Sequence, residues 1–418
     1  MLSTLPFFIL IFITFDILCD STNPINELVD IKLNDMGINK LSSEILEKRT
    51  TARNEDMRGC YYRDQTAIIH SRPFRRLKHK TQVFFSPKDD HVCTRIEHVL
   101  HVASVAATIC RGLNTKGPDW NLNEDLAYAI GLGHDIGHAP FGHSGESELN
   151  RILGGNNSFI HEINSYRVVE KLIGLNLTYA VKDGIIFHNG ENFERTIKPD
   201  FVVKNLDEIK DRKHYPSTFE GCIVRFSDKI AYLGRDLEDA IIAADFIKKK
   251  DIPKSIQDKI GTSNGEIINH LVFDLINSST EEEICFSEEC HKLILELKDF
   301  NNKYIYKHQR IIEYEKYCKK IISNLFDYLS KLYCSNHWDL EWYQSKENLD
   351  IDRFFGRYIM NAKAFYEKEK KDNNWSEGNL CVQIVTDYIS GMTDNFAIDC
   401  MKEISIPRPI EFNSRKKY

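Results

Sequence analysis

The chain has 418 residues, of which 42% are hydrophobic and 28% are charged, as in soluble globular proteins. This length is enough for two or three average domains or for one large one. The net charge of −7 excludes the global basic field that marks many nucleic-acid-binding and membrane-surface proteins, so an anionic ligand has to be bound by a local cluster of cations.

The chain begins with an apolar leader, residues 1–20. Within it, residues 5–18 (LPFFILIFITFDIL) are apolar apart from Thr14 and Asp16, and they resemble the hydrophobic part of a signal peptide. However, no Lys or Arg precedes this run, and it is short for a membrane span. The 11 cysteines are scattered singly, and this spread suits a reduced intracellular protein better than a disulfide framework. We therefore expect a cytoplasmic protein, with export or anchoring through residues 1–20 as the alternative.

Helical periodicity dominates the chain after the leader. We expect an N-terminal helical segment over residues 21–54. Apolar residues recur at helical spacing over residues 94–113 and predict a long helix there. Asn123 is a typical N-cap for a second helix that continues to His134, where a Gly and a Pro shortly afterwards end it.

The chain from residue 187 onward continues this pattern. Residues 187–211 predict loops with a short hairpin, because Asn-Gly, Pro-Asp and β-branched residues gather there. Residues 217–247 predict a long helix with one apolar stripe, and the remainder is again mostly helical. The predicted fold class is therefore all-α, with a helical core at 55–245 and an additional helical C-terminal region at 246–418.

The most informative stretch is residues 133–146 (GHDIGHAPFGHSGE). Its histidines and carboxylates, interleaved with Gly and Pro, do not suit a packed core. The adjacent side chains of His134 and Asp135 can both reach one divalent ion only if the helix breaks just after them, and Gly137 and Pro140 supply that break. Imidazole and carboxylate ligands suit Mn, Fe, Zn or Mg, and the ligand set alone does not choose among these metals.

Further ligands have to come from other parts of the chain. His98 lies in an otherwise apolar helix, and Arg95 lies one turn before it on the same face. Asp228 interrupts the apolar helix of the second half. Tyr232 and Asp236 follow Asp228 at helical spacing, on the side away from the apolar stripe. These polar positions are the candidates for completing a site.

The order His98, His134-Asp135 and Asp228 resembles the H…HD…D signature of the HD superfamily of metal-dependent phosphohydrolases. The neighbouring segments are similar to the dGTPase branch of that superfamily, and they extend over about residues 50 to 400. The matching segments are 75–84 (RRLKHKTQVF), 134–146 (HDIGHAPFGHSGE), 227–232 (SDKIAY) and 387–394 (DYISGMTD). An isolated His-Asp dipeptide would be weak evidence, whereas this ordered set is specific.

The resemblance implies hydrolysis of deoxynucleoside triphosphates to the deoxynucleoside and inorganic triphosphate, with one divalent metal ion in the site. It implies that four residues coordinate the metal: His98, His134, Asp135 and Asp228. It implies that His143 is catalytic and that Glu146 is its acidic partner. The positions implied to contact the substrate are His138 and His161 facing the phosphates, Arg95 and Lys229 holding phosphate oxygens, and Gln82, Tyr232 and Asp236 surrounding the deoxyribose. His101 and His188 are expected to be structural.

Several alternatives remain open at the level of the sequence. The expected substrate is dGTP, although Gly234-Arg235-Asp236 stands where bacterial dGTPases commonly carry His-Asp. The first alternative is an HD phosphohydrolase acting on another nucleotide, either as a 5′-nucleotidase or as a hydrolase of a signalling nucleotide. The second is a catalytically inactive metal-binding regulator or nucleic-acid-binding scaffold. The resemblance also implies a homo-oligomer, because relatives assemble as tetramers or hexamers.

Overall fold

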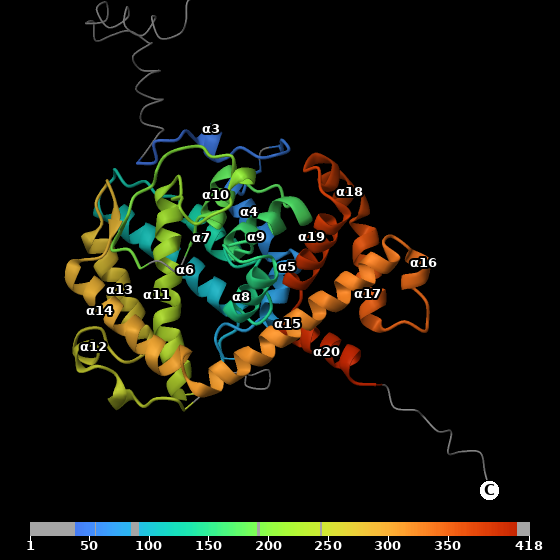
Figure 1. Ribbon diagram of the computed structural model, residues 1–418. Coiled ribbons are helices and arrows are strands. Elements are labelled where there is room, and N and C mark those ends of the chain that lie inside the picture. The colour runs from blue at the N-terminus through green and yellow to red at the C-terminus, as the bar shows by residue number, and fades with distance from the viewer. Residues whose placement is uncertain (1–37, 55, 85–91, 190–192, 243–244, 408–418) are drawn as a thin grey trace, which may run out of the picture.

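The computed structural model describes residues 38–407, apart from 55, 85–91, 190–192 and 243–244 (Figure 1). The apolar leader and most of the expected N-terminal segment therefore lie outside the described residues. The described part of that segment contains one short helix, α3 (Ser43–Leu46). Among the described residues, no helix combines the length and the apolar character needed to cross a membrane.

The described chain is mostly helical, which confirms the all-α class. The helices that form the first half are α4 (Cys60–Ile69), α5 (Arg72–Arg76), α6 (Arg95–Lys116), α7 (Glu124–Gly133), α8 (His143–Ile152), α9 (His161–Arg167), α10 (Tyr179–Ile186) and α11 (Phe219–Ile242). Those that follow are α12 (Lys254–Lys259), α13 (Asn264–Ser278), α14 (Glu288–Asn301), α15 (Gln309–Asn336), α16 (Leu340–Tyr343), α17 (Asp350–Asn361), α18 (Lys363–Asp372), α19 (Glu377–Ser390) and α20 (Asp394–Ser405).

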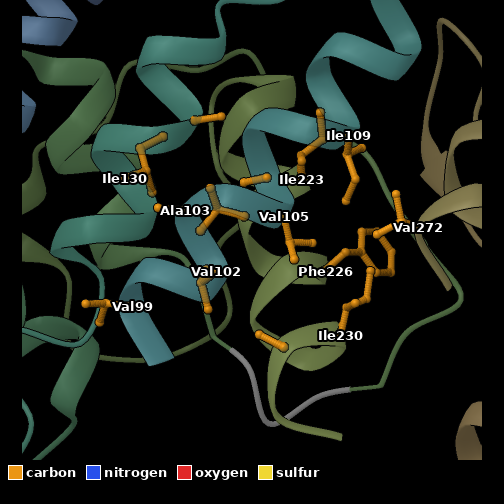
Figure 2. Close-up of a cluster of buried hydrophobic side chains, with 14 of the residues drawn as sticks. Val99, Val102, Ala103, Val105, Ile109, Ile130, Ile223, Phe226, Ile230 and Val272 are labelled. Carbon is orange, nitrogen blue, oxygen red and sulfur yellow. The ribbon is translucent and has the colours of Figure 1, made fainter. Parts of the chain in front are cut away.

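Helices α6, α7 and α11 pack together at the centre of the molecule. Helix α6 starts at a capping box, in which the Glu97 carboxylate accepts the backbone N–H of Thr94 at 2.7 Å. The predicted cap of α7 is confirmed, because the Asn123 side chain accepts the N–H of Leu126. Hydrophobic side chains of α6, α7 and α11 belong to one buried cluster, which also includes Val272 of α13 (Figure 2).

The only strands among the described residues form one two-stranded ribbon. Strand β1 (Thr196–Ile197) pairs antiparallel with β2 (Ile284–Cys285), and Thr196 lies opposite Cys285. The prediction of a hairpin within residues 187–211 is therefore wrong. The partner strand comes from nearly 90 residues further along the chain, and no local turn signal could have indicated it.

The hydrophobic side chains form two large clusters rather than one. The first extends from α3 to Ile305 and contains α12–α14, so these helices pack on the core that precedes them. The second is built from α15–α20, and it also takes in Phe141 and Leu149 from earlier in the chain. Helix α15 runs along both parts (Figure 1). A partly buried ion pair between Arg167 of α9 and Asp387 of α19, at 2.7 Å, joins them further.

Candidate active site

Four side chains from three helical segments meet at one buried point. His98 projects from α6, His134 and Asp135 follow the end of α7, and Asp228 lies in the middle of α11. His98 Nε2 lies 2.9 Å from Asp228 Oδ1, and His134 Nε2 lies 3.8 Å from the same oxygen. Asp135 Oδ1 is 3.8 Å from His134 Nε2. The structure thus brings together all four residues that the sequence indicated as metal ligands.

The donor atoms of this cluster fit a divalent cation. The ring of His134 is oriented by its Nδ1, which lies 2.8 Å from the carbonyl oxygen of Gly131. Its Nε2 faces the cluster, is buried, and has no hydrogen-bond partner among the described residues. Burial also lowers the pKa of His134, which keeps the imidazole neutral and its lone pair available. A buried nitrogen left without a partner beside two carboxylates is the arrangement expected of a metal site.

The two carboxylates are ionised despite their burial. Burial alone would raise the pKa of Asp135, but the neighbouring Arg95 guanidinium holds it well below its usual value. Burial would also raise the pKa of Asp228, but the hydrogen bond to His98 lowers it. Two buried negative charges within one cluster are costly unless positive charge is close. Arg95 Nη1 supplies part of that charge through its short bond to Asp135, and a bound cation would supply the rest.

A second cluster, next to the first, is centred on His161 at the start of α9. Its Nδ1 lies 2.8 Å from Glu146 Oε2, and its Nε2 lies 3.3 Å from His188 Nε2. Burial would lower the pKa of His161, but Glu146 raises it to about 10. His188 stays neutral, because burial lowers its pKa to about 4. The raised pKa favours the protonated form of His161, with Nδ1 beside the Glu146 carboxylate and Nε2 beside the His188 imidazole.

The acidic partners of His161 are themselves held by a cation. Arg212 donates to both carboxylate oxygens of Glu162, at 2.8 and 2.9 Å, and to Glu146 at 3.1 Å. His138 stacks on the ring of His161 with centroids 4.5 Å apart. Both ring nitrogens of His138 are buried and have no hydrogen-bond partner in the described part of the chain. His138 is thus held by stacking, with its polar atoms left for a ligand.

His143 is the first residue of α8 and follows a strained turn. Phe141 has φ +64° and Gly142 has φ +61°, both in the left-handed region. For a residue with a side chain this region costs about 1–2 kcal/mol, so Phe141 needs support from its surroundings. The side chain of His143 is 67% exposed, and its Nδ1 lies 3.7 Å from Glu146 Oε2. It is therefore the one histidine of the two clusters with direct access to solvent.

A pocket of about 310 Å³ opens over both clusters. Of the substrate-contact residues indicated by the sequence, all but Lys229 line it. Tyr306, at the end of a π-helical turn after α14, also lines the pocket and donates to Asp236 Oδ2 at 2.6 Å. The first turns of α15 contribute Ile311, Tyr314 and Glu315. The pocket wall thus joins the cluster of His98, His134, Asp135 and Asp228, called the HD cluster below, to residues from α15 and from the turn before it.

Lys229 lies elsewhere in the structure. Its Nζ is 3.5 Å from Glu194 Oε2, and it lies over the rings of Phe193 and Phe226. It lines a small separate cavity behind α11 rather than the pocket. Lys229 therefore does not line the main pocket, and its contact with a phosphate stays a prediction.

A second, more open pocket of about 440 Å³ lies on the other side of His143. It shares His143, Tyr232 and Tyr306 with the first pocket. Its own lining includes the cationic side chains of Arg212 and Lys298, together with the amides of Asn150, Asn157 and Asn302. His143 therefore stands at the junction of a pocket that contains the metal-type cluster and a pocket lined with cations and amides.

Sequence reasoning missed several residues of this site. His188, expected to be structural, contacts His161 within the second cluster, and a structural role stays the prediction for it. Glu162 follows His161 directly, and that adjacency was a usable signal. Arg212, Tyr306 and Glu315 lie outside every recognised motif, and only tertiary packing brings them to the site.

Comparisons with known proteins agree with this geometry. Residues 95–233 match the HD domain family, and residues 284–359 match the phosphohydrolase-associated domain family. The chain is 38% identical over 371 residues to the deoxyguanosinetriphosphate triphosphohydrolase-like protein of Caldanaerobacter subterraneus subsp. tengcongensis, an alignment that covers 87% of this chain and 91% of that protein.

A protein of the same description from Clostridium perfringens (strain SM101 / Type A) is 34% identical over 400 residues, with 90% of this chain and 95% of that protein covered. The one from Desulfatibacillum aliphaticivorans is 35% identical, with 85% and 90% covered. The chain belongs to the deoxyguanosinetriphosphate triphosphohydrolase-like family. It is an HD-superfamily phosphohydrolase, and the four clustered residues of this family member lie within its HD domain.

Replacing any one of the four clustered residues with Ala should abolish metal binding by this dGTPase-like protein, because each change removes one donor from a buried set of four. Bound metal per chain, measured by elemental analysis after gel filtration, tests this expectation. His101→Ala is the matched control, since His101 lies one turn after His98 on α6 and is only half-buried. Full metal occupancy in Asp228→Ala would contradict the four-ligand assignment.

The stability of the metal-free protein should depend on pH through Asp236. Burial raises the pKa of this carboxyl to about 7, which the hydrogen bond from Tyr306 only partly offsets. The folded state then binds one more proton than the unfolded state between about pH 4 and 7, so Asp236 lowers stability as pH rises, by on the order of 2–4 kcal/mol. Asp236→Asn removes this penalty. Its melting temperature should exceed that of the wild type more at pH 8 than at pH 5, whereas a difference independent of pH would show that Asp236 is not protonated.

Proposed function

We propose that this protein hydrolyses deoxynucleoside triphosphates, with dGTP as the preferred substrate, to the deoxynucleoside and inorganic triphosphate. The observation that carries the proposal is a set of buried polar atoms that line one pocket beside the HD cluster and have no hydrogen-bond partner among the described residues. These atoms are Nε and Nη2 of Arg95, both ring nitrogens of His138 and Oε1 of Gln82. Buried polar groups without partners are rare, and at a pocket wall they indicate a polar ligand.

The two pockets have the polarity that the parts of a nucleotide require. Donors on Arg95 and His138 suit phosphoryl oxygens close to the HD cluster. Lys298 and Arg212 in the adjoining pocket suit the remaining charge of a triphosphate. Between the pockets, Tyr232 and Tyr306 offer an amphipathic wall for a sugar. A ribose 2′-hydroxyl would meet that wall, so we infer a preference for deoxynucleotides.

Glu315 supports guanine as the preferred base. Its carboxylate lines the pocket and makes no hydrogen bond or ion pair within the described residues. A carboxylate accepts hydrogen bonds only, and guanine presents two adjacent N–H donors, on N1 and N2. The other three bases present one such donor or a donor beside an acceptor. Bidentate pairing therefore favours guanine over the other bases.

In the proposed reaction, a water oxygen forms a bond to the α-phosphorus and the bond from phosphorus to O5′ breaks. O5′ leaves with a proton, and His143 is placed to transfer it because it is solvent-accessible and has Glu146 at 3.7 Å. The His161 imidazolium and Arg95 supply fixed positive charge for the phosphoryl oxygens. When bound to His98, His134, Asp135 and Asp228, a divalent ion would add Lewis-acid stabilisation of the same charge.

The direct test is to incubate purified protein with each dNTP, and with GTP, in the presence of Mn²⁺ or Mg²⁺, and to separate nucleoside from triphosphate. We expect deoxynucleoside and triphosphate as products, with dGTP fastest and GTP clearly slower. Glu315→Gln should lower kcat/KM for dGTP about 10- to 100-fold relative to dATP, because one guanine donor loses its acceptor.

Other results would favour the other functions. Equal rates with dGTP and GTP would remove the argument for a sugar pocket. Release of inorganic phosphate from a nucleoside monophosphate would favour a 5′-nucleotidase. Absence of turnover with the metal still bound would favour a regulator.

His143→Ala should retain the metal and lose turnover by about 10²–10⁴-fold, the usual size of a general acid–base contribution. Glu146→Ala should lose less, and the double variant should cost little beyond His143→Ala, because residues that act as a unit are not additive. kcat of the three variants is the measurement, and His214→Ala, on an exposed loop, is the control. If the losses in kcat of the two single variants multiply in the double variant, or if His143→Ala loses its metal, another histidine transfers the proton.

A further inference from the structure

The C-terminal segment 387–394 reaches back to the two loops that carry the site. Lys80 Nζ donates to the carbonyl oxygen of Ser390 at 2.8 Å and also makes a short bond to that of His138. Arg76 Nη1 donates to the carbonyl oxygen of Gly391 at 2.7 Å. The motif recognised near the end of the sequence therefore lies against residues that are more than 240 positions earlier in the chain.

The buried carboxylate of Asp394, the first residue of α20, contacts the backbone of both loops. Its Oδ2 accepts the backbone N–H of Thr81 at 2.8 Å, and its Oδ1 accepts the N–H of Phe141 at 2.8 Å. Thr81 directly precedes Gln82, and Phe141 lies two residues before His143. One side chain thus holds the backbone of both loops, with one carboxylate oxygen for each loop.

The backbone that Asp394 holds is strained. Phe141 adopts a left-handed φ of +64°, which a residue with a bulky side chain keeps only where its surroundings impose it. A Cβ on the adjoining Gly142 would lie 3.0 Å from Arg95 Nη2 and 3.3 Å from the carbonyl oxygen of Gln82. The two loops are therefore in contact at this turn, immediately before His143 begins α8. A shift of the turn would move His143 relative to Gln82 and Arg95.

We propose that Asp394 is a positioning residue, which fixes the Phe141–Gly142 turn against Thr81 and thereby orients His143 toward the substrate. This inference rests on the proposed role of His143 in proton transfer. Asp394 itself does not line either pocket, so it acts through the backbone and not on the substrate. This positioning role would also explain why segment 387–394, late in the chain, contacts the loops that carry the active-site motifs.

The isosteric change Asp394→Asn tests the proposal. The amide keeps one oxygen, but its NH₂ group faces a backbone N–H donor, so one of the two bonds is lost. We expect kcat for dNTP hydrolysis to fall about 10- to 100-fold, because a small misplacement of a reacting group has effects of this size, while bound metal stays unchanged. The same change in the His143→Ala background should cost less than about 3-fold, because residues that act as a unit are not additive.

A matched control separates positioning from general stability. Asp352 is also a buried carboxylate, and it accepts the N–H of Leu349 and the hydroxyl of Tyr328 within the second core, away from the two loops. Asp352→Asn should lower the melting temperature but leave kcat within about 2-fold. If Asp394→Asn does not fold, Thr393→Ala offers a milder change, because the Thr393 side chain caps α20. It should give the same lack of additivity with His143→Ala.

A readout without catalysis distinguishes failure of this inference from failure of the proposed function. The amide hydrogen of Phe141 is bonded to a buried carboxylate, so hydrogen exchange in peptides containing residues 139–143 should be slow in the wild type and at least 10-fold faster in Asp394→Asn. Unchanged exchange, or losses in kcat that multiply with His143→Ala, would overturn the positioning role. Faster exchange in a protein that hydrolyses no dNTP would leave the support of the turn intact and reject only the proposed reaction.

Discussion

The structure depends on keeping two carboxylates ionised inside a helical core. Asp135 and Asp228 are buried within one cluster, and such a pair is tolerated only when cations and hydrogen-bond donors surround it. Arg95 and His98 fulfil part of this requirement and come from the same face of α6. The contact of α6 with α7 and α11 is therefore fixed from two sides, by the apolar layer between the helices and by the charges at one end of that layer.

In the second cluster the buried charge is positive, and acceptors surround it instead of donors. The His161 imidazolium is the buried charge, and Glu146, Glu162 and His188 surround it. Arg212 then balances the carboxylates from the loop that precedes α11. Because both N–H groups of His161 are engaged, it supplies fixed charge, whereas His143 and His138 keep nitrogen atoms free for other partners. The site thus separates residues that hold charge from residues that can exchange a proton.

The sequence was informative where chemistry is encoded locally. The break after His134-Asp135 and the interruption of an apolar helix by Asp228 were visible without a structure, and the all-α class followed from periodicity. Lys229 shows what a helical pattern leaves open. Successive residues of a helix point about 100° apart, so Asp228 can face the cluster while Lys229 faces Glu194 behind the helix. Glu315 and Arg212 carry no motif, and their positions follow only from how α15 and the loop before α11 pack.

Helix α15 couples ligand binding in the pocket to the packing of the two hydrophobic cores against each other. Its first turns contribute Ile311, Tyr314 and Glu315 to the pocket, while its later residues, among them Leu325 and Leu329, lie in the second hydrophobic core. A molecule that fills the pocket therefore contacts side chains anchored in both cores at once. Its binding free energy adds to the free energy that holds the two cores together, because a ligand stabilises whichever assembly it requires. Occupancy of the pocket and docking of the C-terminal half are consequently linked equilibria, and each strengthens the other.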